Sequence, residues 1–373
     1  MQESASFFQV LFNIVLWLFI YVVLKPAYMA PYTLKPAKRR LGFVLILLFC
    51  LYPFWGGDYF HYKEIFLDFQ KGAGLSGQED IYDWIFRTFG YSYTFLRLSI
   101  WGIALLILFW AYKRTCQSID LTLFFFGVCF LPTFSYARVS LAMSLILLGL
   151  TFIVNKGKLP KIISIVFGGG FILCSALFHK SAPIGIVMAL ASLFLINASK
   201  KKIVFIVLLI PLLVVALQNA LNYFSIMELD ADTFITDRAR STYFETDSSG
   251  STGIGALIGT ILQQGPSYLV AVLYLITAWS GRTSLFTVPE RTISAYAFCI
   301  TMLSLGFSLD LGYSLSVLQY RTLFFAFPAN AVFLAAVHRN RIENRLFKFI
   351  FYSTIIGVGY QFIYSTYLAL FLH

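Results

Sequence analysis

A small set of ionisable side chains lies at the ends of long apolar runs in the sequence. The set comprises Asp58, His61, Arg97, Arg138, His179 and Arg321. Guanidinium groups stay charged and bind phosphate oxygens through paired hydrogen bonds, so the arginines suit a diphosphate ligand. The aspartate and the histidines are candidate proton acceptors. Together they predict a site that binds a phosphate-bearing ligand beside a general base, although any single arginine at a helix end is also explained by interfacial snorkelling.

Other residue types that often carry chemistry lack the spacing that defines a site. No HxxxH or paired-cysteine pattern occurs, and the acidic residues between 228 and 247 do not follow the EF-hand spacing. No GxSxG element marks a nucleophilic serine, and no Walker A element marks a nucleotide site. We therefore expect neither a metal nor a cofactor.

The composition places these groups in a membrane protein. Hydrophobic residues make up 59% of the 373 residues and charged residues only 12%, whereas soluble domains carry about 25% charged residues. The 40 Phe and 22 Tyr residues suit lipid-facing and interfacial surfaces. A soluble enzyme and a disordered chain are excluded, and the net charge of +11 is explained by membrane topology without nucleic acid. The predicted fold class is an all-α polytopic membrane protein.

Apolar runs long enough to cross a membrane recur along the whole chain. We predict twelve spans, at 7–24, 41–56, 94–112, 119–136, 138–154, 162–178, 181–197, 203–220, 254–280, 292–309, 321–337 and 346–371. The first run follows Glu3 without a basic segment before it, so we expect a retained helix instead of a cleaved signal. The chain then forms one transmembrane domain over residues 1–373.

The connecting segments alternate in charge. One alternate set holds 19 of the 28 Lys and Arg residues, and the other holds 14 of the 17 acidic residues. By the positive-inside rule the basic set is cytoplasmic, so both termini and the candidate site face outward. The outward side has two sizeable loops, 57–93 and 221–253, and the sequence from Glu79 to Arg87 predicts an amphipathic helix on the membrane surface.

Four short elements resemble those of a known family. Gly57-Asp58-Tyr59-x-x-Tyr62 resembles the GxDYxxY element of the EpsG family, a branch of the Wzy-type bacterial polysaccharide polymerases. Three further segments are similar to other elements of this family. They are Arg138-Val-Ser-Leu-Ala142 (R-x-x-[LI]-A), Phe178-His179-Lys180-Ser181-Ala182 (FHxSA) and Gln319-Tyr320-Arg321 (a late aromatic-Arg element). Together they cover about residues 50–325 in the expected order and on one side.

The resemblance implies a glycosyltransferase of GT-C-like architecture that needs no metal. Such enzymes transfer a growing glycan from undecaprenyl diphosphate onto the next lipid-linked repeat unit, at the outer face of the bacterial inner membrane. A flippase and a chain-length regulator are the implied protein partners, beside membrane lipid. In this interpretation Arg138 and Arg321, helped by Arg97 or by Arg238 and Arg240, hold the diphosphate, and Asp58 or His179 accepts the proton, with His61 beside them. Candidate sugar contacts are Tyr59, Tyr62, Tyr136, Gln319 and Tyr320.

One feature departs from related polymerases. Other Wzy branches place RX10G-like arginine elements in large outward loops, but Arg238 and Arg240 lack that spacing. Arg138 and Gly149 have the spacing, within a predicted helix. Several outward aromatics, including Tyr82, Trp84, Tyr91 and Tyr93, could stack on sugars or form an ordinary interfacial belt.

Four other functions are alternatives to this interpretation. A glycan ligase would use similar charges for a single transfer. A transporter would place charges near the bilayer midplane and show internal repeats, which this sequence lacks. A membrane acyltransferase would have a catalytic histidine within a span. A scaffold without catalytic activity also remains compatible with the sequence.

Overall fold

The computed structural model describes most of the chain as helices. The described residues are 7–29, 34–51, 56–72, 81–131, 137–154, 160–179, 181–196, 200–210, 212, 214, 254–308, 319 and 322–371. For residues 56–61, 137, 254–260, 263, 308 and 368–371 the description covers the backbone alone. Within these ranges the chain contains helices and short connections and no strand. The prediction of an all-α protein is therefore confirmed.

The helices follow the apolar runs of the sequence. They are α1 (Phe7–Met29), α2 (Pro36–Leu51), α3 (Gly56–Gln70), α4 (Ile81–Phe89), α5 (Tyr93–Thr115), α6 (Ile119–Phe125), the π-helix η1 (Phe126–Phe130), α7 (Ala137–Val154), α8 (Lys161–Cys174), η3 (Ser175–Leu177), α9 (Ala182–Phe194), α12 (Ile254–Trp279), η5 (Arg282–Leu285), α13 (Val288–Ser308), α15 (Phe327–Arg339) and α16 (Arg345–Phe371). Residues 200–210 are helical as well. Each of the twelve predicted runs thus contains a helix.

Three described helices are long and apolar enough to cross a membrane. They are Phe7–Met29, Tyr93–Thr115 and Arg345–Tyr367. Four further apolar helices are shorter, namely Ile119–Phe130, Arg138–Val154, Lys161–Leu177 and Ala182–Phe194. A span of about 30 Å needs roughly 20 helical residues, so the shorter helices lie at the lower limit or below it.

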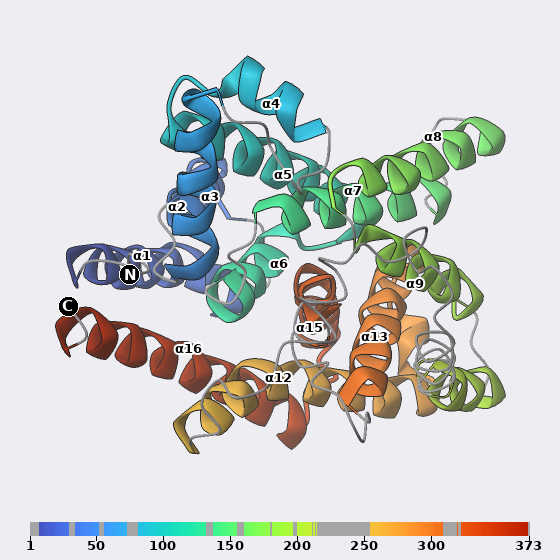
Figure 1. Cartoon of the computed structure of the whole chain (residues 1–373). Helices are drawn as coiled ribbons and strands as arrows, with labels where there is room; N and C mark the ends of the chain where they lie inside the picture. The colour runs from blue at the N-terminus through green and yellow to red at the C-terminus, as the bar shows by residue number, and fades with distance from the viewer. Residues whose placement is uncertain are drawn as a thin grey trace, which may run out of the picture.

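Helix α15 lies in the middle of the bundle (Figure 1), and residues Phe327 to Val337 are all buried. The neighbouring pairs α5 and α7, α7 and α8, α12 and α16, and α13 and α15 pack side by side. Because α15 is apolar around its whole circumference and rich in alanine, it can be enclosed on all sides by other helices. The large core that results includes the rings of Phe124, Phe125, Tyr112 and Trp101.

Two glycines set the distance between α7 and α8. A Cβ atom on Gly149 would lie 2.5 Å from the carbonyl oxygen of Gly168, and a Cβ on Gly168 would lie 2.7 Å from the carbonyl oxygen of Gly149. The two backbones therefore touch where neither residue has a side chain, which is the small-residue packing typical of membrane helices. Gly149, whose spacing from Arg138 resembles a family motif, thus has a direct packing role.

The predicted span 119–136 differs from a regular helix. After Phe125 the α-helical turn widens into the π-helix η1, which ends at Phe130. The indole nitrogen of Trp17 in α1 donates a hydrogen bond to the carbonyl oxygen of Val128, 3.1 Å away. A π-turn leaves carbonyl groups without the usual partner, and here a side chain from a neighbouring helix satisfies one of them.

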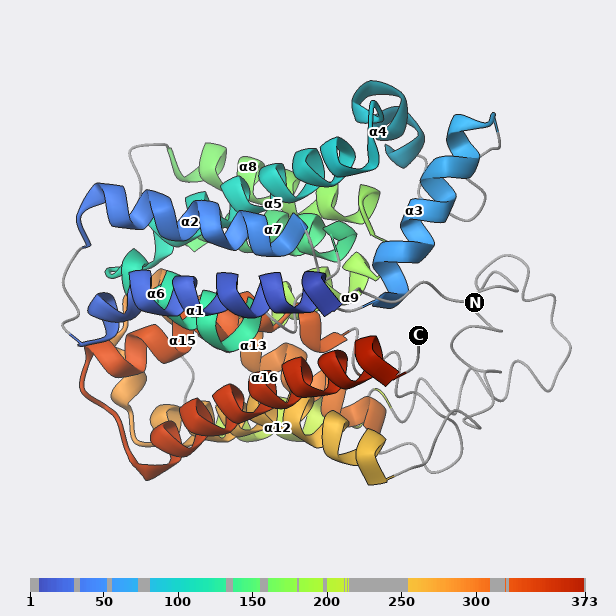
Figure 2. The same cartoon turned by 90° about the vertical axis from the view of Figure 1, so that its left-hand side faces the viewer.

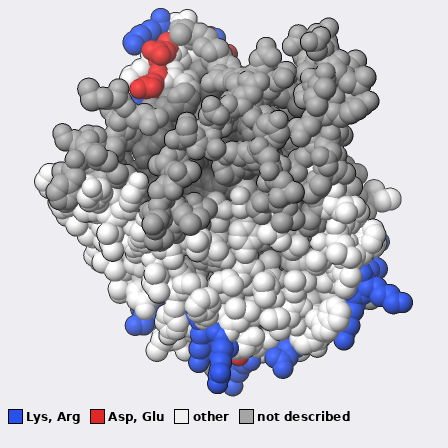
Figure 3. All heavy atoms as spheres, turned by 60° about the horizontal axis from the view of Figure 1, so that its bottom comes forward, with Lys and Arg blue, Asp and Glu red and all other residues white. Residues whose placement is uncertain are grey.

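The three acidic residues predicted on the cytoplasmic side each contact a basic side chain. Asp120 in α6 contacts Arg39 of α2 at 2.5 Å and 2.9 Å, and it also accepts the backbone N–H of Leu34 at 2.7 Å. Glu343 contacts His338 at the end of α15. Lys and Arg side chains dominate the rest of this edge, next to a broad uncharged band of surface (Figure 3). The predicted clustering of basic charge at one end is confirmed for this part of the chain.

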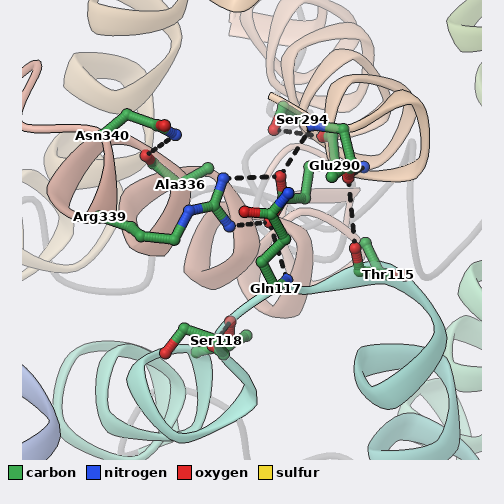
Figure 4. Close-up of polar contacts among 10 residues, drawn as sticks. Thr115, Gln117, Ser118, Glu290, Ser294, Ala336, Arg339 and Asn340 are labelled. Carbon is green, nitrogen blue, oxygen red and sulfur yellow. Dashed lines mark hydrogen bonds and ion pairs between the residues drawn. The ribbon is translucent and has the colours of Figure 1, made fainter. Parts of the chain in front are cut away.

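Glu290 forms the third pair and joins three elements (Figure 4). Its carboxylate contacts the Arg339 guanidinium at 2.5 Å and 3.0 Å and accepts the backbone N–H of Gln117 at 3.2 Å. Thr287 and Glu290 also form a reciprocal capping box at the start of α13, with N···O distances of 3.0 Å and 3.3 Å. One buried carboxylate therefore holds the starts of α6 and α13 and the end of α15 together.

Helices α3 and α4 lie at the opposite end, where α1 begins and α16 ends (Figure 2). The predicted amphipathic helix is confirmed as α4, whereas α3 occupies residues that we predicted as loop. The apolar side chains Ile65, Phe66 and Phe69 recur at helical spacing and pack against a small core, which explains α3. Helix α2 covers the predicted second span, 41–56, as far as Leu51, and residues 52–55 lie outside the described residues. Loop 221–253 lies outside the described residues.

Candidate functional site

A second, smaller hydrophobic core positions the candidate site. Helix α3 contributes Phe66, helix α4 contributes Tyr82, Ile85 and Phe86, and helix α5 contributes Leu96 and Ile100. The partly buried Phe178, which follows η3, packs against them. Helix α4 presents Tyr82, Ile85 and Phe86 on one face at helical spacing. The burial of this face fixes α4 across the ends of α3 and α5, beside the start of α7.

Arg138 lies in the first turn of α7 and contacts two tyrosines. Its Nη2 atom donates a hydrogen bond to the hydroxyl of Tyr62 in α3. Its guanidinium carbon lies 4.6 Å from the ring centroid of Tyr62 and 5.4 Å from that of Tyr82, within the range of cation–π attraction. The positive end of the α7 dipole adds to the charge of the guanidinium. This group is therefore held in place and suited to an anionic ligand.

Arg97 lies in the second turn of α5, with 5% of its surface exposed. Its Nη2 donates to the carbonyl oxygen of Cys50, 2.8 Å away at the end of α2. Helix ends leave carbonyl groups without partners, so this contact satisfies one of them. The guanidinium carbon also lies 5.9 Å from the ring centroid of Tyr93. Arg97 thus has a structural role at the same place where it contributes positive charge.

One small cavity brings these residues together. Its volume is about 30 Å³, and its lining residues are Tyr62, Tyr82, Phe86, Tyr93, Leu96, Arg97, Ile100 and Arg138. The sequence-predicted residues Tyr62, Arg97 and Arg138 come from three separate helices and meet here. Among the described residues, the lining contains two guanidinium groups and no carboxylate. It therefore favours an anion, with room for about one water molecule in this state.

His179 follows η3 and is held by its own turn. Its Nδ1 accepts the backbone N–H of Ser181 at 3.1 Å and lies 2.5 Å from the Ser181 hydroxyl oxygen. Because Nδ1 accepts a backbone donor, the neutral ring carries its proton on Nε2. In this arrangement the ring can donate a hydrogen bond through Nε2, while its basic nitrogen faces Ser181.

Tyr82 connects the two parts of the site. Its side chain is 1% exposed, and its hydroxyl donates to the carbonyl oxygen of Phe178, 3.1 Å away and directly before His179. The sequence left two roles open for Tyr82 and Tyr93, stacking on sugars or an interfacial belt, and the structure places both in the lining of the cavity. The spacing of Tyr82 from Ile85 and Phe86 indicates the buried face of α4. In contrast, Trp84 is 58% exposed and suits the belt.

The outer face of α4 is charged. Asp83 and Arg87, one turn apart, form an exposed ion pair with N···O distances of 2.6 Å and 3.2 Å. The hydrogen bond that Arg87 donates to Asp83, followed by the charge of Asp83, raises the pKa of Arg87. This arginine is exposed and is not among the described residues that line the cavity, so it provides a comparison for Arg138.

Gln319 belongs to a separate group of contacts. Its side-chain Nε2 donates to the hydroxyl of Tyr268 in α12 at 2.7 Å, and its backbone carbonyl oxygen accepts from the Ser304 hydroxyl of α13 at 3.0 Å. The hydroxyls of Tyr268 and Ser304 are 3.0 Å apart, which closes a ring of three hydrogen bonds. Among the described contacts, none joins Gln319 to the cavity of Arg138.

The remaining predicted site residues are described in part or not at all. Asp58, Tyr59 and His61 lie in α3, for which only the backbone is described at these positions. Tyr136, Arg238, Arg240, Tyr320 and Arg321 lie outside the described residues. Within the described ranges, no group of three or more His, Cys, Asp or Glu side chains could hold a metal ion.

Comparison with known proteins agrees with the motif resemblance. No curated protein and no solved structure matches the chain. The family model of EpsG matches residues 38–372, which include the cavity, the His179 turn and Gln319. The match and the apolar helices indicate an integral membrane protein of polysaccharide biosynthesis. The chain belongs to the EpsG family.

Proposed function

We propose that this protein is a polysaccharide polymerase of the bacterial inner membrane. It joins oligosaccharide repeat units carried on undecaprenyl diphosphate, at the outer face of the membrane. Twelve spans in a GT-C-like arrangement form the membrane domain. The observation that carries the proposal is the cavity in which Arg97 and Arg138 meet Tyr62, at the end of the bundle opposite the basic edge. The family match supports the same class of reaction.

The charge distribution supports the outward orientation of the site. The paired acids Asp120 and Glu290 and most of the Lys and Arg side chains lie at the other end of the helices. The positive-inside rule assigns that end to the cytoplasm. The start of α7, which carries Arg138, then lies in the outer leaflet, where a diphosphate headgroup of a lipid carrier is found.

Arg138 binds the diphosphate of the donor lipid. A guanidinium makes bidentate contacts with phosphate and stabilises the negative charge that grows on the leaving diphosphate as the glycosidic bond breaks. In the present state one N–H of the Arg138 guanidinium donates a hydrogen bond to the Tyr62 hydroxyl. The cavity has room for about one water molecule. Donor binding therefore replaces the Tyr62 contact with a phosphate oxygen. Arg97 and, from outside the described residues, Arg321 supply further positive charge, with Arg238 and Arg240 as additional candidates.

Asp58 is the preferred proton acceptor. It lies four residues before Tyr62 in α3, and residues four apart share one face of a helix. The basic Nδ1 of His179 is already occupied by Ser181, so His179 suits hydrogen-bond donation through Nε2 better than proton abstraction. The acceptor hydroxyl loses its proton to Asp58 as it attacks the anomeric carbon, and the lipid diphosphate leaves with one inversion. Tyr59, Gln319 and Tyr320 contact the sugars, with His61 and Tyr136 nearby in sequence.

Substitution of Arg138 tests the proposal in cells. A strain without its own copy of the gene is complemented with Arg138→Ala, Arg138→Lys or Arg87→Ala, and surface polymer is resolved by length on a gel. We expect no polymer from Arg138→Ala and a strong reduction from Arg138→Lys, because an ammonium cannot make the bidentate contact. Arg87→Ala, which removes an exposed arginine of α4, should leave the polymer unchanged.

Protein amounts in the membrane are compared by immunoblot. Full-length polymer from Arg138→Ala at normal protein level would contradict the proposal. A product with a single added unit in the wild type would indicate a ligase, and glycan movement without bond formation would indicate a transporter.

A further inference from the structure

We propose that Tyr82 is a positioning residue that fixes the turn of His179 relative to Arg138. Helix α4 is then a structural part of the catalytic site, in addition to a helix at the membrane surface. The inference rests on the proposed function, because it assigns a role to a residue of the same site. Two contacts made by one side chain carry it.

The ring and the hydroxyl of Tyr82 reach different parts of the site. The ring centroid lies 5.4 Å from the guanidinium carbon of Arg138, and the hydroxyl donates to the carbonyl oxygen of Phe178 at 3.1 Å. Phe178 immediately precedes His179, so the hydrogen bond holds the turn at its base. Tyr82, a residue of α4, therefore contacts both α7 and this turn.

The position of Tyr82 is itself fixed. The side chain is 1% exposed, and its neighbours on the same face, Ile85 and Phe86, are each 6% exposed. They pack with Phe66 of α3 and with Leu96 of α5 in the smaller core. A tyrosine that is held on both sides by apolar contacts can keep its hydroxyl in one place without losing further side-chain entropy.

The described backbone hydrogen bonds of the His179 turn are local. The backbone N–H of Phe178 donates to Ser175 at 3.1 Å, and that of Ala182 donates to the carbonyl of His179 at 2.9 Å. These bonds, like those of Ser181 to the ring, lie within the same short segment. They shape the turn, and the elements that flank it, α8, η3 and α9, pack directly against α7. The hydroxyl of Tyr82 adds a restraint from α4 at Phe178, the residue before His179.

Tyr82→Phe removes the hydroxyl and keeps the ring beside Arg138. Donor binding through Arg138 is retained, so the KM for lipid-linked repeat units should stay within twofold of the wild type. We expect kcat to fall about tenfold, the rate equivalent of one hydrogen bond. Tyr82→Leu, which also removes the ring, should raise KM as well as lower kcat. Tyr91→Phe is the matched control, since Tyr91 is 82% exposed.

A double-mutant cycle with His179→Ala separates positioning from general stability. If Tyr82 acts through His179, Tyr82→Phe has no further effect on kcat once His179 is alanine. A merely structural role would lower kcat by the same factor in both backgrounds and would overturn the inference. Wild-type kcat in Tyr82→Phe would overturn it too. If Arg138→Ala itself polymerises normally, the proposed function fails, whereas a dead Arg138→Ala beside a fully active Tyr82→Phe refutes only the role of Tyr82.

Discussion

Replacement of Glu290 by Gln tests the buried ion pair that joins α6, α13 and α15. The carboxylate is 2% exposed and the Arg339 side chain 14% exposed, and the two groups make contacts of 2.5 Å and 3.0 Å. Glu290 also accepts the backbone N–H groups of Gln117 and Thr287. Glutamine has the same shape, but it has no charge and offers one oxygen where the carboxylate offers two.

The magnitude follows from what the substitution leaves behind. Removing one partner of a buried pair costs about 3–5 kcal/mol, because the other charge stays in the protein without compensation. The partial exposure of Arg339 gives its charge some access to water, so we expect a loss near the lower limit, about 3 kcal/mol. Both backbone donors, of Gln117 and Thr287, also lose a charged acceptor, and one of them loses its acceptor altogether because the amide nitrogen is a donor. This is a large part of the total stability of a typical protein, about 5–15 kcal/mol.

Equilibrium unfolding in mixed detergent micelles, followed by tryptophan fluorescence, measures the change. Asp83→Asn serves as the control, because its ion pair with Arg87 is exposed and should contribute nothing measurable. The double variant Glu290→Gln with Arg339→Met should recover much of the loss, since it removes the unpaired charge. A loss below about 1 kcal/mol for Glu290→Gln alone would refute the reasoning.

Two further predictions concern packing and the Gln319 contacts. Gly149→Ala should lower stability by about 1–3 kcal/mol, because its Cβ would lie 2.5 Å from the Gly168 carbonyl oxygen; Gly169→Ala, with open space around its Cβ, should be neutral or slightly stabilising in the same unfolding assay. Equal effects of the two substitutions would contradict the packing argument. Tyr268→Phe should lower the free energy of unfolding by about 1–2 kcal/mol, because its hydroxyl bonds both Gln319 and Ser304. A larger loss in Ser304→Ala would contradict the central place of Tyr268 among these contacts.

The helices could be predicted because a chain segment in a membrane must satisfy its backbone hydrogen bonds internally, which favours a helix. The apolar runs of the sequence show where such segments lie. Helix α3 was missed because polar residues interrupt its sequence, although Tyr62, Ile65, Phe66 and Phe69 recur at helical spacing. The π-helix at Phe126–Phe130 could not be foreseen either. Its cause is tertiary, since Trp17 from another helix satisfies a carbonyl group there.

The candidate site was predictable as a set of residues but not as a set of contacts. Charge patterning placed Arg97 and Arg138 on one side of the membrane, and the structure shows that they line one cavity with Tyr62. The sequence alone could not show that Arg97 also satisfies the end of α2. Tyr82 was not distinguished from belt aromatics, because its burial depends on how α4 docks against α3 and α5.

Reconstitution of the purified protein tests the central claim most directly. The protein in lipid vesicles receives undecaprenyl-diphosphate-linked repeat units from its host, without nucleotide or added metal, and the products are separated by gel. The account predicts a ladder of repeat-unit multiples from the wild type and from Arg87→Ala, and none from Arg138→Ala. A wild-type protein that produces no ladder from intact substrate, or an Arg138→Ala variant that produces a normal one, would contradict it.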